Sequence, residues 1–280
     1  WGRLPVQPVA AATCTWTGNA GDGLWASPSN WTGCTGGGAP ASTDDVLLDN
    51  STVANDYTVT LPTGNVKVAI NKLTIAPNEG KTVTLVLPSG NIYGASGDAG
   101  FVVGDATSST DDIILNNGAI LKNSSGATAG NGIQVNTPAN GTIRINNGGK
   151  YIHNTSRSTG GIVPALSTAS GTETGIFEQD SPGTGSVAIS ASGRNYGTLI
   201  LTRSAGAATY TASGGSPLTV RGDFIINSGV TFNSTMTANM LVAGNWTHNG
   251  TAFSHNSTVI FNGTAEQTIG GSSATTFNNL

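Results

Sequence analysis

The residues best suited to metal binding or acid–base chemistry in this chain are acidic. Four aspartates, Asp98, Asp105, Asp111 and Asp112, lie within fifteen positions of one another. Oxygen-rich loops of this kind can bind calcium. However, the chain has no calcium repeat of the Gly-Gly-x-Gly-x-Asp type, and aspartate before a strand is an ordinary turn residue. We therefore expect these aspartates to form turns, with calcium binding as the weaker alternative and no other metal.

A polysaccharide-cleaving site would need different chemistry. It requires paired carboxylates, or a metal-bound carboxylate with an arginine or lysine base, gathered on one face. The arginines and glutamates are instead few and dispersed, at Arg3, Arg144, Arg157, Arg194, Arg203, Arg221, Glu79, Glu173, Glu178 and Glu266. Because no pair of them is placed convincingly, the sequence predicts no catalytic activity and no cofactor.

Histidines are the remaining candidate ligands. His248 and His255 are seven positions apart, and they and His153 fall in polar, asparagine-rich segments without the spacing of a metal motif. The simplest interpretation is that all three are exposed residues of turns.

Two cysteines, Cys14 and Cys34, are the only thiols, and they bracket a glycine- and tryptophan-rich segment that has little other means of holding one conformation. We expect them to form a disulfide, with two free thiols as the alternative. Closing a loop of about 20 residues stabilises a fold by about 3 kcal/mol in the chain-entropy model. Such a bond persists only in an oxidising compartment.

Three tryptophans lie in the same segment. Trp16, Trp25 and Trp31 could form a platform on which sugar rings stack, or they could cap the open hydrophobic end of a repeat structure. We favour the capping role.

The composition limits the elements that can position these side chains. The 280 residues include 40 glycines and 11 prolines, and only 9% are charged. So many helix-breaking residues exclude long helices and favour strands and turns. With 11 basic residues and a net charge of -4, the chain has no basic patch for nucleic acid or for an anionic membrane surface. No apolar run approaches the roughly 18 residues that a membrane span needs.

Internal repeats are the strongest sign of the architecture. The motif Ile-Ile-Leu-Asn-Asn-Gly at 113–118 recurs thirty residues later as Ile-Arg-Ile-Asn-Asn-Gly at 143–148. Phe224 and Phe232 recur as Trp246 and Phe253, 22 and 21 residues further on. Asparagine and glycine recur at the corners because a tight turn needs a positive φ, which these residues adopt at the least cost. The second spacing is that of one coil of a solenoid.

These repeats predict an all-β fold, specifically a right-handed parallel β-helix (β-solenoid), in which stacked coils share one narrow core. Tandem β-sandwich modules, which need long-range antiparallel pairing, are the alternative. We divide the chain into an extended N-terminal arm (1–13), a disulfide-linked, tryptophan-rich capping module (14–50) and solenoid repeats (51–280), the last of them incomplete.

The opening module resembles a known group. It reads Trp-Thr-Gly at 16–18, Gly-Asp-Gly-Leu-Trp at 21–25, Asn-Trp at 30–31 and Asp-Asp-Val at 44–46. This series is similar to the start of many secreted bacterial surface proteins with autotransporter-like or adhesin-like β-helix repeats. Residues 244–280 are similar to the repeats of the same group. The resemblance implies export, a cell-surface setting and a parallel β-helix. It carries no catalytic residues, and the cysteine pair is not part of the pattern.

We therefore expect a secreted, extracellular protein without catalytic activity: a cell-surface adhesin, a stalk or a self-assembling filament subunit. The expected contact lies between the arm, at Leu4, Val6 and Val9, and the last strand, at Phe277 and Leu280, of a neighbouring copy. The alternative is a carbohydrate-binding or polysaccharide-cleaving β-helix protein, with a glycan or another cell-surface ligand as its partner.

Overall fold

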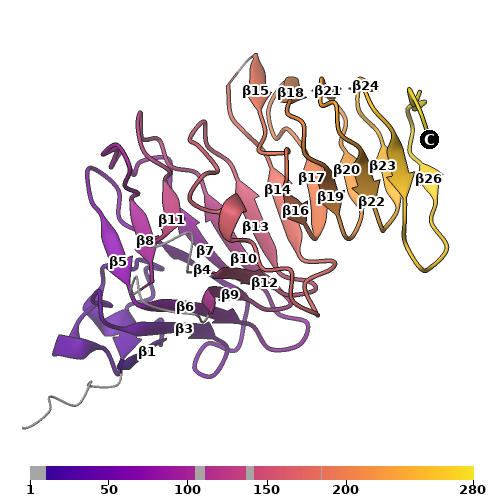
Figure 1. Ribbon diagram of the computed structural model, residues 1–280. Helices are drawn as coiled ribbons and strands as arrows, with labels where there is room; N and C mark the ends of the chain where they lie inside the picture. Colours follow the sequence, from indigo (N-terminus) through magenta and orange to yellow (C-terminus); the bar gives the residue numbers. More distant parts are fainter. Residues whose placement is uncertain (1–10, 105–110, 137–141, 184) are drawn as a thin grey trace, which may run out of the picture.

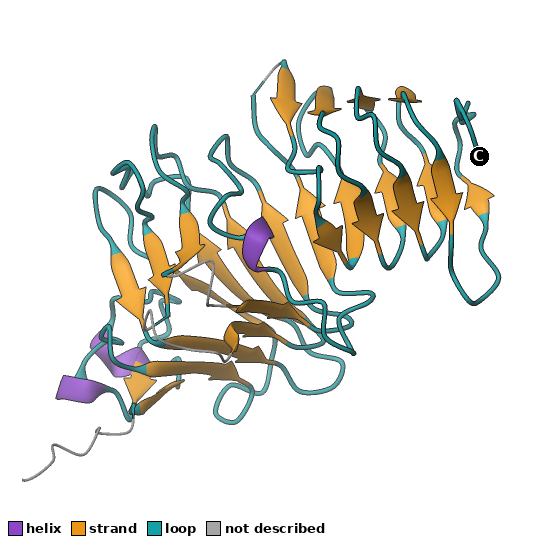
Figure 2. Cartoon of the chain, in the orientation of Figure 1, coloured by secondary structure: helices purple, strands orange, loops and turns teal. Residues whose placement is uncertain are grey.

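The computed structural model describes residues 11–104, 111–136, 142–183 and 185–280. About 40% of the chain is strand and 3% is helix, so the expected all-β class is confirmed. Strands run the length of the molecule, while the described helices are single short turns (Figure 2). These 3-10 turns are η1 (Pro28–Asn30), η2 (Thr35–Gly37) and η3 (Val163–Ala165).

One long sheet runs through the whole stack of strands (Figure 1). Its strands lie side by side in chain order, and every described pair is parallel. The chain therefore leaves the sheet after each strand and returns to add the next strand beside the previous one. Its strands are β4 (Tyr57–Thr60), β7 (Val83–Leu87), β10 (Ala119–Asn123), β13 (Lys150–His153), β14 (Ile176–Gln179), β17 (Thr198–Leu201), β20 (Phe224–Ile226), β23 (Trp246–His248) and β26 (Ile269–Gly270).

Two sheets accompany the first half of the long sheet. The six-stranded sheet contains β1 (Thr13–Trp16), β2 (Trp31–Thr32), β3 (Asp45–Asp49), β6 (Lys72–Ala76), β9 (Asp111–Leu115) and β12 (Thr142–Ile145). The three-stranded sheet contains β5 (Val68–Ile70), β8 (Phe101–Val103) and β11 (Ile133–Val135). β3 pairs in parallel with β1 on one side and with β6 on the other, so it connects the N-terminal segment to the strands that follow.

Two four-stranded sheets accompany the second half. One contains β15 (Ser186–Ala188), β18 (Ala208–Ala212), β21 (Val230–Ser234) and β24 (Ala252–His255). The other contains β16 (Asn195–Tyr196), β19 (Leu218–Val220), β22 (Met240–Val242) and β25 (Val259–Phe261).

The core is a set of columns that run along the stack. Strand registers align one inward residue from each strand of the long sheet from β4 to β23, and each of these side chains is at most 1% exposed. The column is Val59, Leu85, Leu121, Tyr151, Phe177, Leu199, Phe224 and Trp246. Each layer thus covers the apolar side chain of the next layer. In this way a large number of thin layers can share one core.

The repeats found in the sequence coincide with this stacking. Ile113 is in register with Ile143, and Phe224 with Trp246. The Asn146 amide donates a 2.7 Å hydrogen bond to the Asn116 side-chain oxygen one layer below. Among the described strand pairs only β1 and β2 are antiparallel, so the long-range antiparallel pairing that the sandwich alternative needs is absent from the described residues.

Candidate functional site

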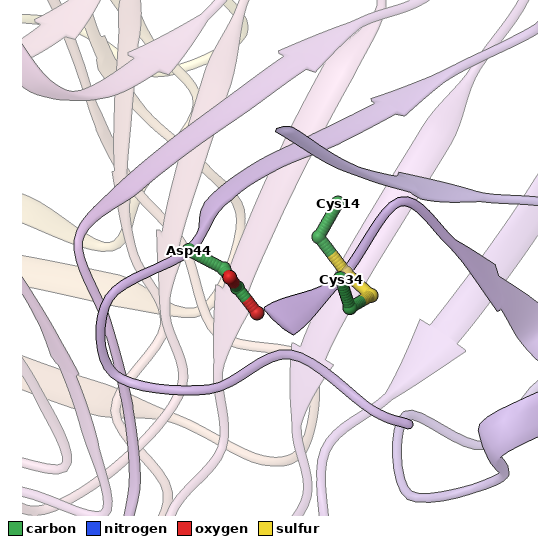
Figure 3. Close-up of side chains that lie close together, drawn as sticks. All are labelled: Cys14, Cys34 and Asp44. Atoms are coloured by element: carbon green, nitrogen blue, oxygen red, sulfur yellow. A yellow bond between two sulfur atoms is a disulfide. The ribbon is translucent and has the colours of Figure 1, made fainter. Parts of the chain in front are cut away.

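A cluster of two cysteines and one aspartate lies beside β1 (Figure 3). Cys14 and Cys34 form the expected disulfide, with 4.3 Å between their Cα atoms. Cys14 and Asp44 are fully buried and Cys34 is partly buried. Their ligand atoms lie within 4.8 Å of one another, the only such group of three among the described residues.

The contacts of this cluster show that it holds the loop between Cys34 and Asp44 in place and is not a metal centre. We call Cys14, Cys34 and Asp44 the clamp. Both sulfurs are consumed by the disulfide, so they offer no thiolate. The Asp44 carboxylate accepts hydrogen bonds from the backbone N–H of Thr35, at 3.1 Å, and of Ala41, at 2.8 Å. These contacts close the loop between Cys34 and Asp44 at both ends. The disulfide then ties the start of that loop to β1.

Removal of the disulfide is expected to lower the free energy of unfolding by roughly 3 kcal/mol, because the bond closes a segment with a sequence separation of 20 and restricts the unfolded chain. Urea unfolding of the oxidised protein, the reduced protein and the Cys14→Ser/Cys34→Ser variant measures this loss. The reduced protein and the variant should agree. Equal midpoints for all three would contradict the clamp.

A groove of about 770 Å³ opens next to this clamp. Its floor is the outer face of the three-stranded sheet, where Ala69 of β5 is in register with Val102 of β8. One wall comes from the clamped loop, at Thr35, Ser42 and Thr43. The remaining lining residues are Ala11, Ala12, Lys67, Ile70, Asn71, Gly104 and Asn136. Sequence reasoning missed this groove because its residues come from segments far apart in the chain and share no motif.

Lys67, which lines the groove, forms a charged trio with Asp98 and Tyr93. The Asp98 carboxylate accepts hydrogen bonds from the Lys67 ammonium, at 2.8 Å, and from the Tyr93 hydroxyl, at 2.9 Å. Burial pushes the pKa of Asp98 upward, but the hydrogen bonds from Lys67, the Ala99 N–H and Tyr93 outweigh it and leave that pKa below its usual value. The bond to Asp98 raises the pKa of Tyr93. At neutral pH the trio therefore offers an ammonium paired with a carboxylate and a protonated phenol.

The three tryptophans lie in the interior. Trp16, Trp25 and Trp31 are 2%, 2% and 7% exposed. Trp31 makes edge contacts with both of the others, at 4.9 and 4.7 Å between ring centroids. Trp16 stacks on Tyr57 of β4, and Trp25 contacts Phe101 of β8. They pack against the first coils of the stack, and a sugar ring has no open aromatic face to stack on there.

The acidic calcium candidates do not gather into a site within the described residues. Asp98 is held by Lys67 and Tyr93. Asp111 accepts a hydrogen bond from the Thr142 hydroxyl and faces the Arg144 guanidinium at 3.7 Å. Asp112 is buried. Asp105 lies outside the described residues.

The expectation of exposed histidines is wrong. His153, His248 and His255 are 1%, 1% and 4% exposed, because each ends a strand at an inward position rather than sitting in a turn. His153 Nε2 lies 2.9 Å from the Arg157 carbonyl oxygen, and His255 Nδ1 lies 2.9 Å from the Ser234 hydroxyl. The Nε2 atoms of His248 and His255 are buried without a hydrogen-bond partner among the described residues.

The residues proposed for assembly differ in accessibility. Phe277 is half-buried and packs against Trp246, Phe253 and Phe261, with centroid distances of 5.2 to 6.0 Å. Leu280 is 70% exposed. Leu4, Val6 and Val9 lie outside the described residues.

Comparison with known proteins finds no relative. No family model, no curated protein and no solved structure matches the chain. No helix in the described part of the chain is long and apolar enough to cross a membrane. The function must therefore be argued from the stack of strands and from the groove.

Proposed function

We propose that the chain is a right-handed parallel β-helix that acts as an extracellular structural protein of the cell surface, as a stalk, an adhesin or a self-assembling filament subunit, without catalytic activity. The observation that carries the proposal is the unbroken inward column of the long sheet, in which consecutive strands pair in parallel. Crossovers between parallel strands are right-handed in nearly all proteins, which supports the proposed hand. A stack of this kind is long, and each layer supports its neighbours.

The setting at the cell surface rests on two further observations. The Cys14–Cys34 disulfide suits an oxidising environment outside the cytosol. Only 9% of the residues are charged, and the outer positions of the β15 sheet carry small or hydroxylated side chains: Ser186, Thr209, Thr231 and Ala252 in one register column. Small uncharged faces favour repeated contact between copies of the chain.

Self-assembly is tested by electron microscopy of the full chain and of a variant that lacks residues 1–10. The sequence places a last strand at Phe277 and Leu280, but the last strand of the structure is β26 and only an isolated bridge at Asn279 lies beyond it in the described part of the chain. We propose that the arm at Leu4, Val6 and Val9 pairs with this C-terminal segment of a neighbouring copy. Filaments are then expected for the full chain and isolated particles for the deletion variant. Filaments that persist after the deletion would reject the arm as the contact. Isolated particles in both samples would reject self-assembly and leave the stalk or adhesin.

A further inference from the structure

The groove beside the clamp carries hydrogen-bonding groups that have no partner in the described part of the chain. The hydroxyls of Thr35, Ser42 and Thr43 make no hydrogen bond to a described residue. Asn71 donates through its amide nitrogen to Asp45, at 2.6 Å, and Asn136 donates in the same way to the Gly104 carbonyl, at 3.1 Å. Both bonds fix the amide group and leave its oxygen to accept a bond from a ligand. Three hydroxyls and two oriented amide oxygens thus surround one concavity.

The floor of the groove is small and apolar. Val102 is 5% exposed and Ala69 beside it is partly exposed, so Ala69 supplies most of the accessible apolar surface of the floor. The backbone of β8 is paired on both sides, with β5 and with β11, whereas β5 is an edge strand of this sheet in the described part of the chain. An extended peptide would need a free strand edge to add to the sheet. On this floor such a strand could pair only at the edge of β5, whereas the groups that line the concavity itself are side-chain hydroxyls and amides beside an apolar floor.

The charge of the groove favours an uncharged ligand. Lys67 is the only charged side chain among the described lining residues, and it forms an ion pair with Asp98 at 2.8 Å. A volume of about 770 Å³ falls within the usual range of small-ligand sites. The clamped loop also holds the wall hydroxyls in place before binding, since the disulfide and the Asp44 carboxylate fix its two ends.

We propose that this groove binds a short neutral oligosaccharide, whose hydroxyls bond to the wall and to the amide oxygens while a sugar ring rests on Ala69. The proposal goes beyond the structural role and does not depend on self-assembly. It also places carbohydrate binding away from the buried tryptophans.

The test uses the full oxidised chain and four trisaccharides: cellotriose, maltotriose, chitotriose and the acidic trigalacturonate. Binding is followed by saturation-transfer NMR and by titration of backbone amide shifts. At least one neutral trisaccharide should bind, with a dissociation constant of about millimolar, and should shift the amides around Ser42 and Ala69. Ala69→Trp places a large ring on the floor and should weaken that binding by at least about tenfold.

Two further variants keep the test decisive. Ala252→Trp makes the same substitution at an exposed outward position of β24, on a remote sheet, and should bind the sugar as the unmodified chain does. Ser42→Ala/Thr43→Ala removes two wall hydroxyls without adding bulk and should also weaken binding. The proposal is overturned if none of the neutral sugars binds, if only the acidic sugar binds, or if the groove variants bind as tightly as Ala252→Trp. None of these outcomes bears on filament formation.

Discussion

Replacing Phe224 by alanine is expected to lower the free energy of unfolding by about 3–5 kcal/mol, the usual loss for a buried phenylalanine. Phe224 is fully buried, lies in register between Leu199 and Trp246, and contacts the Trp246 ring at 4.8 Å between centroids. The cavity would open within the inward column, between Leu199 and Trp246. Because each layer of stacked parallel strands is supported by its neighbours, the loss should also loosen the layers on either side.

The matched control is the next residue along the same strand. Ile225 points outward, and Ile225→Thr copies Thr247, the outward residue one coil further on. We expect this variant to lose less than about 0.5 kcal/mol, as surface substitutions usually do. Urea unfolding measures both losses, and hydrogen exchange shows which amides lose protection. Similar losses for the two variants would mean that the inward column is not what stabilises the stack.

The sequence predicts the stacking well wherever one coil copies another. Ile113 and Ile143, or Phe224 and Trp246, are equivalent residues of consecutive layers, and a fixed spacing is enough to pair them. The disulfide could also be expected, because no other cysteine competes with Cys14 and Cys34.

Other features of the molecule have no local signal. The groove joins the loop that contains Ser42 to the outer face of β5 and β8, so it depends on how one sheet lies beside the clamped module. The histidines were misplaced for a different reason. In Trp246-Thr247-His248 the alternation already makes His248 inward if Trp246 is inward, but a polar side chain next to asparagine favours a turn unless the register is known.

Acidification is expected to destabilise the protein through His153. This residue is fully buried, with Nδ1 3.3 Å from the Tyr151 hydroxyl and Nε2 2.9 Å from the Arg157 carbonyl oxygen. Burial lowers its pKa from 6.5 to about 4, although the bond to Arg157 opposes the shift. Between pH 6.5 and about pH 4, His153 is therefore mostly protonated in the unfolded chain and mostly neutral in the folded chain. The contribution of His153 to the free energy of unfolding is fully present above pH 6.5. It is lost as the pH falls from 6.5 to about 4, by roughly 3 to 4 kcal/mol in total.

The neighbouring coil provides the control, since Gln179 occupies the register position of His153. His153→Gln should keep the polar contacts, remove the titrating group and flatten the curve of unfolding free energy against pH between 6.5 and 4. Burial also lowers the pKa of His255, so a smaller slope of the same sign should remain in the variant. The difference between the two curves isolates His153 from the carboxylates, which titrate in both proteins. Curves of equal slope would show that the folded protein accommodates a charged imidazole at position 153. The interior of the stack would then have to be more polar than its packing indicates.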